Sequence, residues 1–258
     1  MPGQLKIGTI KSNPSAGYIG FYPSFQAASD LQMTDQSGKG NHALFGADLT
    51  GSEAWSTLAN HYSTPEDTTG TQANGAMLTM DASTYNPATE SLFVFAKVRI
   101  TAPGGTRPLF GTANGTPNAG FGLKFTAAGK ARVDLHRPSA DLIINTSSAS
   151  IADGTSHSVA LGIDAVLLRV YVWVDGVLDN NFVSAVGNTF AVSDWYPFTR
   201  AFAFGGAGHN GGKIISGAQS SFGWHILKRT GGLPSSISTV AERLHQNPTI
   251  PLAATEWA

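Results

Sequence analysis

The sequence predicts an all-β protein in which two antiparallel sheets stack face to face as a sandwich. The clearest observation lies in residues 153–181, where two runs alternate between aliphatic side chains and polar or aromatic ones. Because alternate residues of a strand point to opposite faces of a sheet, the aliphatic set is expected to face a core. Short apolar runs separated by glycine, proline and asparagine recur along the rest of the chain, as is typical of β-sandwiches.

These two alternating runs predict which side chains are buried. The expected core positions are His157, Val159, Leu161 and Ile163 in the first run and Leu168, Val170, Val172 and Val174 in the second. On its other face, the second run presents Arg169, Tyr171 and Trp173. The dipeptide Asp175-Gly176 follows, and this pair favours the tight turn of a β-hairpin.

The remaining elements are shorter and are predicted in chain order from the same signals. Strands are expected at residues 76–80, 92–100, 108–112, 120–126, 131–137, 142–145, 182–186 and 202–204, and within 214–227. Residues 46–74, 194–198 and 205–212 are expected to be loops. A helix is expected at residues 235–245, where Ile237, Val240, Ala241 and Leu244 recur at helical spacing before Asn247-Pro248.

Four segments resemble parts of laminin G-like domains in both sequence and order. They are residues 35–42 (DQSGKGNH), residues 153–160 (DGTSHSVA), residues 173–176 (WVDG), and residues 222–229 together with the helix that ends at Asn247-Pro248. Ser156 stands where many members of this family have tryptophan. The resemblance covers roughly residues 30–248 and implies a concanavalin A-like jelly roll. That fold hosts lectins, adhesion modules, glycosidases and virus structural proteins, so it does not determine the function.

Because the resemblance begins near Asp30, we expect an N-terminal arm at residues 1–30 and a laminin G-like domain at residues 31–258. The arm contains an aromatic cluster with almost no charge: Tyr18, Ile19, Phe21, Tyr22 and Phe25. This cluster forms either an additional edge strand of the sandwich or an arm that docks on a neighbouring subunit. We expect the second, because a free apolar patch of this kind marks an interaction site.

Composition excludes several classes of partner. Charged residues make up 13% of the 258 residues and the net charge is −1, so no basic surplus exists to neutralise the phosphates of a nucleic acid. The absence of cysteine excludes disulfides and thiolate metal sites. With no apolar run long enough to span a bilayer and no secretion signal at Met1, we expect no membrane partner and either a cytoplasmic protein or one exported by another route.

The sequence predicts neither an enzyme nor a cofactor. Glycosidases on this fold need two close carboxylates, and none of the five glutamates has an acidic residue two positions away. Residues 206–211 match G-x-G-x-x-G by letter, but a strand rather than a helix is expected to follow them. No zinc motif or nucleophilic serine motif is present. Laminin G-like domains often bind one calcium ion, and the aspartates at turns are Asp35, Asp153 and Asp175, although turn formation alone explains each of them.

The best candidates for binding are aromatic. Arg169, Tyr171 and Trp173 form one set, and Trp195 and Tyr196 lie at the tip of an aromatic loop. Such residues stack on sugar rings or dominate protein–protein interfaces, but they also cover a sheet against a loop. All three interpretations stay open for both sets.

Non-enzymatic binding or assembly is therefore the expected function. Free-standing laminin G-like chains without signal peptide or cysteine resemble structural proteins of bacteriophage particles. The first interpretation is thus a virion component, either a capsid decoration or a tail protein, that is assembled in the host cytoplasm as a homo-oligomer or on capsid or tail proteins. The alternative is a carbohydrate-binding or adhesion module at an extracellular surface, with a glycan as its partner.

Overall fold

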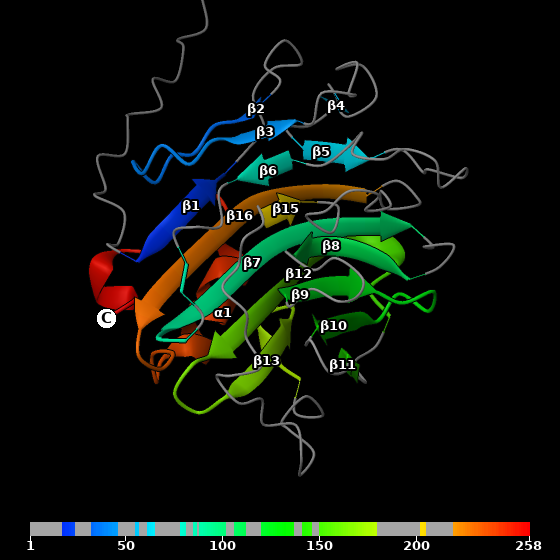
Figure 1. Ribbon diagram of the computed structural model, residues 1–258. Helices are drawn as coiled ribbons and strands as arrows, with labels where there is room; N and C mark the ends of the chain where they lie inside the picture. The colour runs from blue at the N-terminus through cyan, green and yellow to red at the C-terminus, as the bar shows by residue number, and fades with distance from the viewer. Residues whose placement is uncertain are drawn as a thin grey trace, which may run out of the picture.

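The computed structural model describes thirteen segments of the chain, which form two antiparallel sheets and a short C-terminal helix (Figure 1). The described residues are 17–23, 32–45, 55–56, 61–64, 78–80, 85–86, 88–101, 106–111, 120–136, 141–145, 150–179, 202–204 and 219–258. The predicted strand at 182–186 lies outside them. The prediction of an all-β antiparallel sandwich is confirmed.

The first sheet is built around three strands of twelve residues each, β7 (Glu90–Thr101), β12 (Asp153–Asp164) and β16 (Gln219–Thr230). Its order is β14-β13-β12-β7-β16-β5-β4, and β1 also pairs with β16. The other members are β1 (Tyr18–Tyr22), β4 (Trp55–Ser56), β5 (His61–Thr64), β13 (Arg169–Val174) and β14 (Val177–Leu178). Strands from both ends of the chain therefore lie side by side in this sheet.

The second sheet has the order β11-β10-β9-β8-β15-β6-β3-β2. Its members are β2 (Gln32–Met33), β3 (Ala43–Phe45), β6 (Leu78–Met80), β8 (Arg107–Gly111), β9 (Gly120–Phe125), β10 (Ala131–His136), β11 (Asp141–Asn145) and β15 (Phe202–Phe204). Alternation in β9 turns Phe121, Leu123 and Phe125 toward the first sheet, where each is buried.

The main core fills the space between the two sheets. Leu161 of β12 is paired with Val94 of β7 on one side and with Val172 of β13 on the other, and all three are 0% exposed. Val170 is buried as well, while Leu168 and Val174 are half-buried and pack against this core. The predicted facing of the second alternating run is therefore confirmed. Each fully buried aliphatic side chain contributes about 1.5–3 kcal/mol to folding.

A second core covers the opposite face of the first sheet. The helix α1 (Ile237–Gln246) buries Val240, Ala241 and Leu244 against this face, and a short 3-10 helix, η4 (Ala254–Glu256), follows it. The sheet contributes Phe93, Phe95, Ala160, Trp173 and Leu227 to the same cluster. The first sheet is thus buried on both faces, and the helix predicted from its apolar spacing is confirmed. No helix among the described residues is long and apolar enough to cross a membrane.

The turn after β13 has the geometry that its sequence predicts. Asp175 and Gly176 both have positive φ, at 51° and 78°, as a type I′ hairpin turn requires. The turn joins β13 to β14, with Val174 paired to Val177. This hairpin prediction is confirmed.

The predicted N-terminal arm is wrong for the segment that the structure describes. Tyr18, Ile19, Phe21 and Tyr22 form β1, pair with residues 224–227 of β16, and are each 3% exposed or less. Tyr18 and Phe21 belong to the core under α1, and Ile19 and Tyr22 to the core between the sheets. The aromatic cluster therefore closes the domain itself, because its side chains find their apolar partners within the same chain. Phe25 lies outside the described residues.

Candidate functional site

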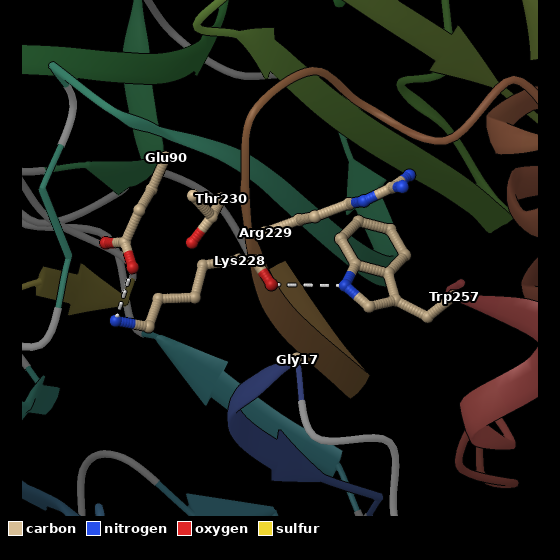
Figure 2. Close-up of a pocket in the computed structure, with 6 residues that line it drawn as sticks. All are labelled: Gly17, Glu90, Lys228, Arg229, Thr230 and Trp257. Atoms are coloured by element: carbon tan, nitrogen blue, oxygen red, sulfur yellow. Dashed lines mark hydrogen bonds and ion pairs between the residues drawn. The ribbon is translucent and has the colours of Figure 1, made fainter.

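A pocket of about 270 Å³ lies where β1, β7, β16 and the C-terminal segment meet. Its lining residues are Gly17, Glu90, Lys228, Arg229, Thr230 and Trp257 (Figure 2). The volume is just below the range of about 300–1,000 Å³ typical of small-molecule sites. The pocket is thus large enough for one compact polar ligand, such as a single sugar unit.

One wall of the pocket carries an ion pair. Lys228 Nζ lies 2.9 Å from Glu90 Oε1, and the backbone N–H of Asn86 donates to Glu90 Oε2 at 2.7 Å. The pair holds the two strand ends together, since Glu90 begins β7 and Lys228 lies near the end of β16. The positive charge of Lys228 is therefore already compensated by Glu90.

The other charged side chain of the pocket is not compensated. Arg229 follows Lys228 and projects from the opposite face of β16, past the indole of Trp257 (Figure 2). Within the described part of the chain, neither its guanidinium nor the hydroxyl of exposed Thr230 makes a hydrogen bond or ion pair. Glu90, Lys228 and Arg229 sum to one positive charge, so the pocket favours a ligand with one negative charge beside hydroxyl groups.

The floor of the pocket depends on a close contact between a glycine and a tryptophan. Trp257 is 4% exposed, and its indole N–H donates to the Lys228 carbonyl at 3.1 Å. A Cβ atom on Gly17 would lie 2.1 Å from Trp257 Nε1, so only glycine allows this approach. The carbonyl of Gly17 in turn accepts from the Lys228 N–H at 2.7 Å. Two hydrogen bonds to the Lys228 backbone, one from the Trp257 indole and one to the Gly17 carbonyl, therefore fix both sides of the floor.

The aromatic set predicted on β13 does not form an open binding platform. Trp173 is 1% exposed, and its indole N–H donates to Ser238 Oγ of α1 at 3.2 Å. Tyr171 is half-buried with its ring 5.8 Å from that of Trp173, and Arg169 alone is exposed at the strand start. The prediction of a binding role for Trp173 is wrong because α1 covers this face. Trp195 and Tyr196 lie outside the described residues.

Asp35, one of the calcium candidates, has a structural role. Its Oδ1 accepts from the backbone N–H groups of Phe21 and Ser37, and its Oδ2 accepts from the Ser37 hydroxyl and the Asn41 N–H, at 2.7–3.0 Å. The carboxylate therefore joins β1 to the loop of residues 35–42. This network also explains why a DxSGxGN segment stands at this point of the fold.

The other two calcium candidates hold a histidine. His157 Nδ1 lies 2.7 Å from Asp175 Oδ2, and Nε2 lies 3.1 Å from Asp153 Oδ1. Burial opposes protonation of His157, but the hydrogen bonds to the two aspartates outweigh it and raise its pKa. The backbone and hydroxyl of Thr155 lower the pKa of Asp153 to about 2. Among the described residues, no group of three or more carboxylate, histidine or cysteine side chains is placed to hold a metal ion.

Sequence reasoning missed the pocket entirely. Its residues come from four separate regions of the chain, and no local motif joins Glu90 to Lys228 or Trp257. The available signal was the dipeptide Lys228-Arg229 at the end of a strand, where consecutive side chains point to opposite faces. That signal becomes informative only once Glu90 is known to neutralise one of the two cations.

Fold and pocket together define a β-sandwich with a small pocket of net positive charge at the ends of β7 and β16. No protein-family model matches the sequence, and no curated protein matches it. Among solved structures, the chain is similar to Trypanosoma rangeli sialidase in complex with sialic acid, with a TM-score of 0.60, 20% identity, and coverage of 92% of this chain and 34% of that one. It is also similar to the covalent intermediate of the same sialidase with 2,3-difluorosialic acid, with a TM-score of 0.59, 20% identity and coverage of 95% and 35%.

A third similar structure is the module CBM40 of the Ruminococcus gnavus IT-sialidase bound to α2,3-sialyllactose. Its TM-score is 0.48 at 16% identity, with 64% of this chain and 92% of that chain covered. The chain spans about a third of the length of the trypanosomal sialidase. The likeness to the trypanosomal sialidase, at a TM-score of about 0.6 and 20% identity, shows a shared fold alone.

Proposed function

We propose that this chain is a non-catalytic carbohydrate-binding module whose pocket holds a sugar unit with a carboxylate group. The observation that carries the proposal is the uncompensated guanidinium of Arg229, which projects past the indole of Trp257 at the mouth of the pocket, while the free hydroxyl of Thr230 lies on the other side of β16 (Figure 2). A guanidinium binds a carboxylate through two parallel hydrogen bonds, and a threonine hydroxyl both donates to and accepts from sugar hydroxyls. Glu90 already has Lys228 as a partner and fixes the geometry of the wall.

The fold supports this ligand class. The trypanosomal sialidase that shares the β-sandwich was solved with sialic acid, which is a sugar with one carboxylate. One such unit fits both the net charge of the pocket and its volume of about 270 Å³. The charge, rather than an aromatic platform, is thus the proposed basis of recognition.

The chemistry of the pocket supports a binding role without catalysis. Among the described residues that line the pocket, Glu90 is the one carboxylate and there is no tyrosine, whereas glycoside hydrolysis uses two carboxylates that flank the bond or, in sialidases, a tyrosine nucleophile. The Glu90 carboxylate is also held by Lys228 and by the Asn86 N–H. We therefore assign it a structural role.

Calorimetric titration of the protein with sialyllactose and with lactose tests the proposal. We expect sialyllactose to bind and lactose to bind at least tenfold more weakly, because lactose lacks the carboxylate. Arg229→Ala should abolish the difference between the two sugars. Arg229→Lys should restore part of it, since a lysine keeps the charge but not the paired donors.

Arg169→Ala provides the matched control. Arg169 is an exposed arginine of the same sheet that does not line the pocket, so its loss should leave the affinity unchanged. Equal affinity of wild type and Arg229→Ala for sialyllactose would overturn the assignment of the pocket. Release of sialic acid by the protein would overturn the non-catalytic role.

The interpretation as a bacteriophage virion component stays a prediction. An aromatic arm was expected to attach the domain to its assembly, and the burial of Tyr18, Ile19, Phe21 and Tyr22 removes this means of attachment for residues 18–22. None of the described residues favours a capsid or tail partner over a glycan. Assembly in a host cytoplasm and exposure at an extracellular surface likewise stay predictions.

A further inference from the structure

The turn between β12 and β13 exposes two aliphatic side chains. Val166 is 64% exposed and Leu167 is 54% exposed, although both lie in a protein that buries nearly all of its described large apolar residues. Ala165 and Leu168 flank them, so the tip is apolar over four consecutive positions. We call residues 165–168 the hairpin tip.

The hairpin tip is held rigidly in this exposed position. Asp164 is 3% exposed, and its Oδ1 accepts from the backbone N–H groups of Val166 and Leu167 at 2.9 and 2.7 Å. Its Oδ2 accepts from the N–H of Leu233 at 2.9 Å. Leu168 adopts a φ of 51°, a conformation that a leucine rarely takes without external restraint. The exposure of the tip is therefore a fixed feature of the fold.

The pocket and the hairpin tip lie at the same end of neighbouring strands. β12 and β16 both end there, with the start of β7 between them (Figure 1). Neighbouring strands are about 4.8 Å apart, so the two strand ends are separated by roughly 10 Å. Ser91 joins them, because its hydroxyl donates to the Gly231 carbonyl and accepts from the Ala165 N–H at 2.9 Å. Gly232, which follows the strand end of β16 by two residues, lies against the tip, because a Cβ atom on it would be 3.7 Å from Val166 Cβ.

We propose that the hairpin tip inserts into the headgroup region of a lipid bilayer while the pocket holds the sugar of a glycolipid in that bilayer. This inference rests on the proposed function and names the form in which its ligand is presented. The expectation of no membrane partner is thereby replaced by a proposed contact between the hairpin tip and the surface of one membrane. No segment has to span the bilayer for such contact.

Charge and size favour a lipid surface over a protein partner. Exposed Arg169 follows the tip, and the one aspartate of the turn, Asp164, is buried and hydrogen-bonded through both oxygens. A cation beside an apolar tip suits the phosphate-rich interface of a membrane. Two aliphatic side chains are far too small for a stable protein interface, which needs about 800 Å² per partner. Together with a sugar pocket at the same end of the strands, they suffice to strengthen binding to a glycolipid.

Vesicle co-sedimentation of the whole chain tests the inference. The probes are phosphatidylcholine vesicles with a minor fraction of a glycosphingolipid whose headgroup is sialyllactose, plain phosphatidylcholine vesicles, and free sialyllactose. Wild type should bind the glycolipid vesicles at least tenfold more tightly than the free sugar and the plain vesicles only weakly. The double variant Val166→Ser/Leu167→Ser should lose about tenfold of affinity for the glycolipid vesicles and none for free sialyllactose.

Val177→Ser is the matched control, because Val177 is 70% exposed and lies at the opposite end of β13. It should leave both affinities unchanged. Equal affinity of wild type and the double variant for glycolipid vesicles would overturn the inference, as would equal binding of plain and glycolipid vesicles. If wild type binds neither free sialyllactose nor the glycolipid vesicles, the proposed function itself fails.

Discussion

The hydroxyl of Tyr18 donates a hydrogen bond to Nδ1 of His225 across 2.7 Å, deep in the core under α1. Nε2 of His225 donates to the Pro248 carbonyl at 2.7 Å, so that nitrogen carries the ring proton and the imidazole is neutral. The N–H of Leu252 donates to the Tyr18 hydroxyl oxygen at 2.9 Å. This network joins β1, β16 and the C-terminal segment inside the domain.

His225 makes folding sensitive to acid. Burial lowers its pKa to about 3, although the hydrogen bond to the Pro248 carbonyl opposes this shift. The pKa of the unfolded state is about 6.5, so the unfolded chain takes up the proton first as the pH falls. The contribution of His225 to stability is complete above about pH 6.5 and is lost toward pH 3. We expect the free energy of unfolding, measured by urea titration, to fall across this window.

His225→Gln separates this effect from the titration of carboxylates. Glutamine keeps a hydrogen-bond donor and acceptor without a titrating group, so the variant should be less stable at pH 7 but lose less stability between pH 6.5 and 4. The same pH slope in wild type and variant would contradict the assignment. His157 acts with the opposite sign, because its pKa is raised and its contribution is lost as the pH rises above about 6.5.

Val172→Asp should destabilise the domain severely. Val172 is 0% exposed between the sheets, so the new carboxylate would be buried without a partner. The expected cost is about 3–5 kcal/mol, measured by urea or thermal unfolding. Val177→Asp makes the same change at an exposed position of the adjoining strand and should cost about 0.5 kcal/mol or less. Similar melting of the two variants would show that the facing of β13 is wrong.

Trp173→Ala should act through stability rather than through a direct contact with sugar. Its indole fills the space between β13 and α1, with Phe93 at a ring distance of 5.8 Å. Removing it should cost about 3–5 kcal/mol. Trp173→Phe, which keeps much of the volume, should recover a large part of that loss. If Trp173→Ala melted like wild type and lost only sugar binding, an exposed platform on β13 would have to be reconsidered.

Gly17→Ala should destroy the sugar pocket. The new Cβ would lie 2.1 Å from Trp257 Nε1 and 2.9 Å from the Lys228 carbonyl oxygen, so the floor must move. We expect a loss of about 1–3 kcal/mol of stability together with the loss of sialyllactose binding in calorimetry. Gly38→Ala is the comparison, because Gly38 has a φ of 81° but open space around it. That variant should lose stability through backbone strain and retain sugar binding; retention of binding by Gly17→Ala would place the sugar elsewhere.

Several features of the fold were predictable because they depend on local rules. The alternation of Val170 and Val172 with larger side chains predicts a buried face, and both are buried. The pair Asp175-Gly176 predicts a tight hairpin, since both residues tolerate positive φ better than most residues do. The helix at α1 follows from apolar spacing alone. In each case the information lies within one turn or one strand.

The segment that packs against the other face of a strand could not be predicted from local rules. The sequence by itself determined that Trp173 and Val172 point to opposite faces, but the tertiary structure decided that α1 buries Trp173 as well. It also placed Tyr18 against His225 and Glu90 against Lys228, although each pair comes from distant parts of the chain. The physical reason is that burial and ion pairing depend on which distant segment packs against a face of the sheet. The alternation of residues along one strand carries no information about that segment. The pocket of Arg229 and Trp257 arises for the same reason, from the meeting of strand ends and the C-terminal segment.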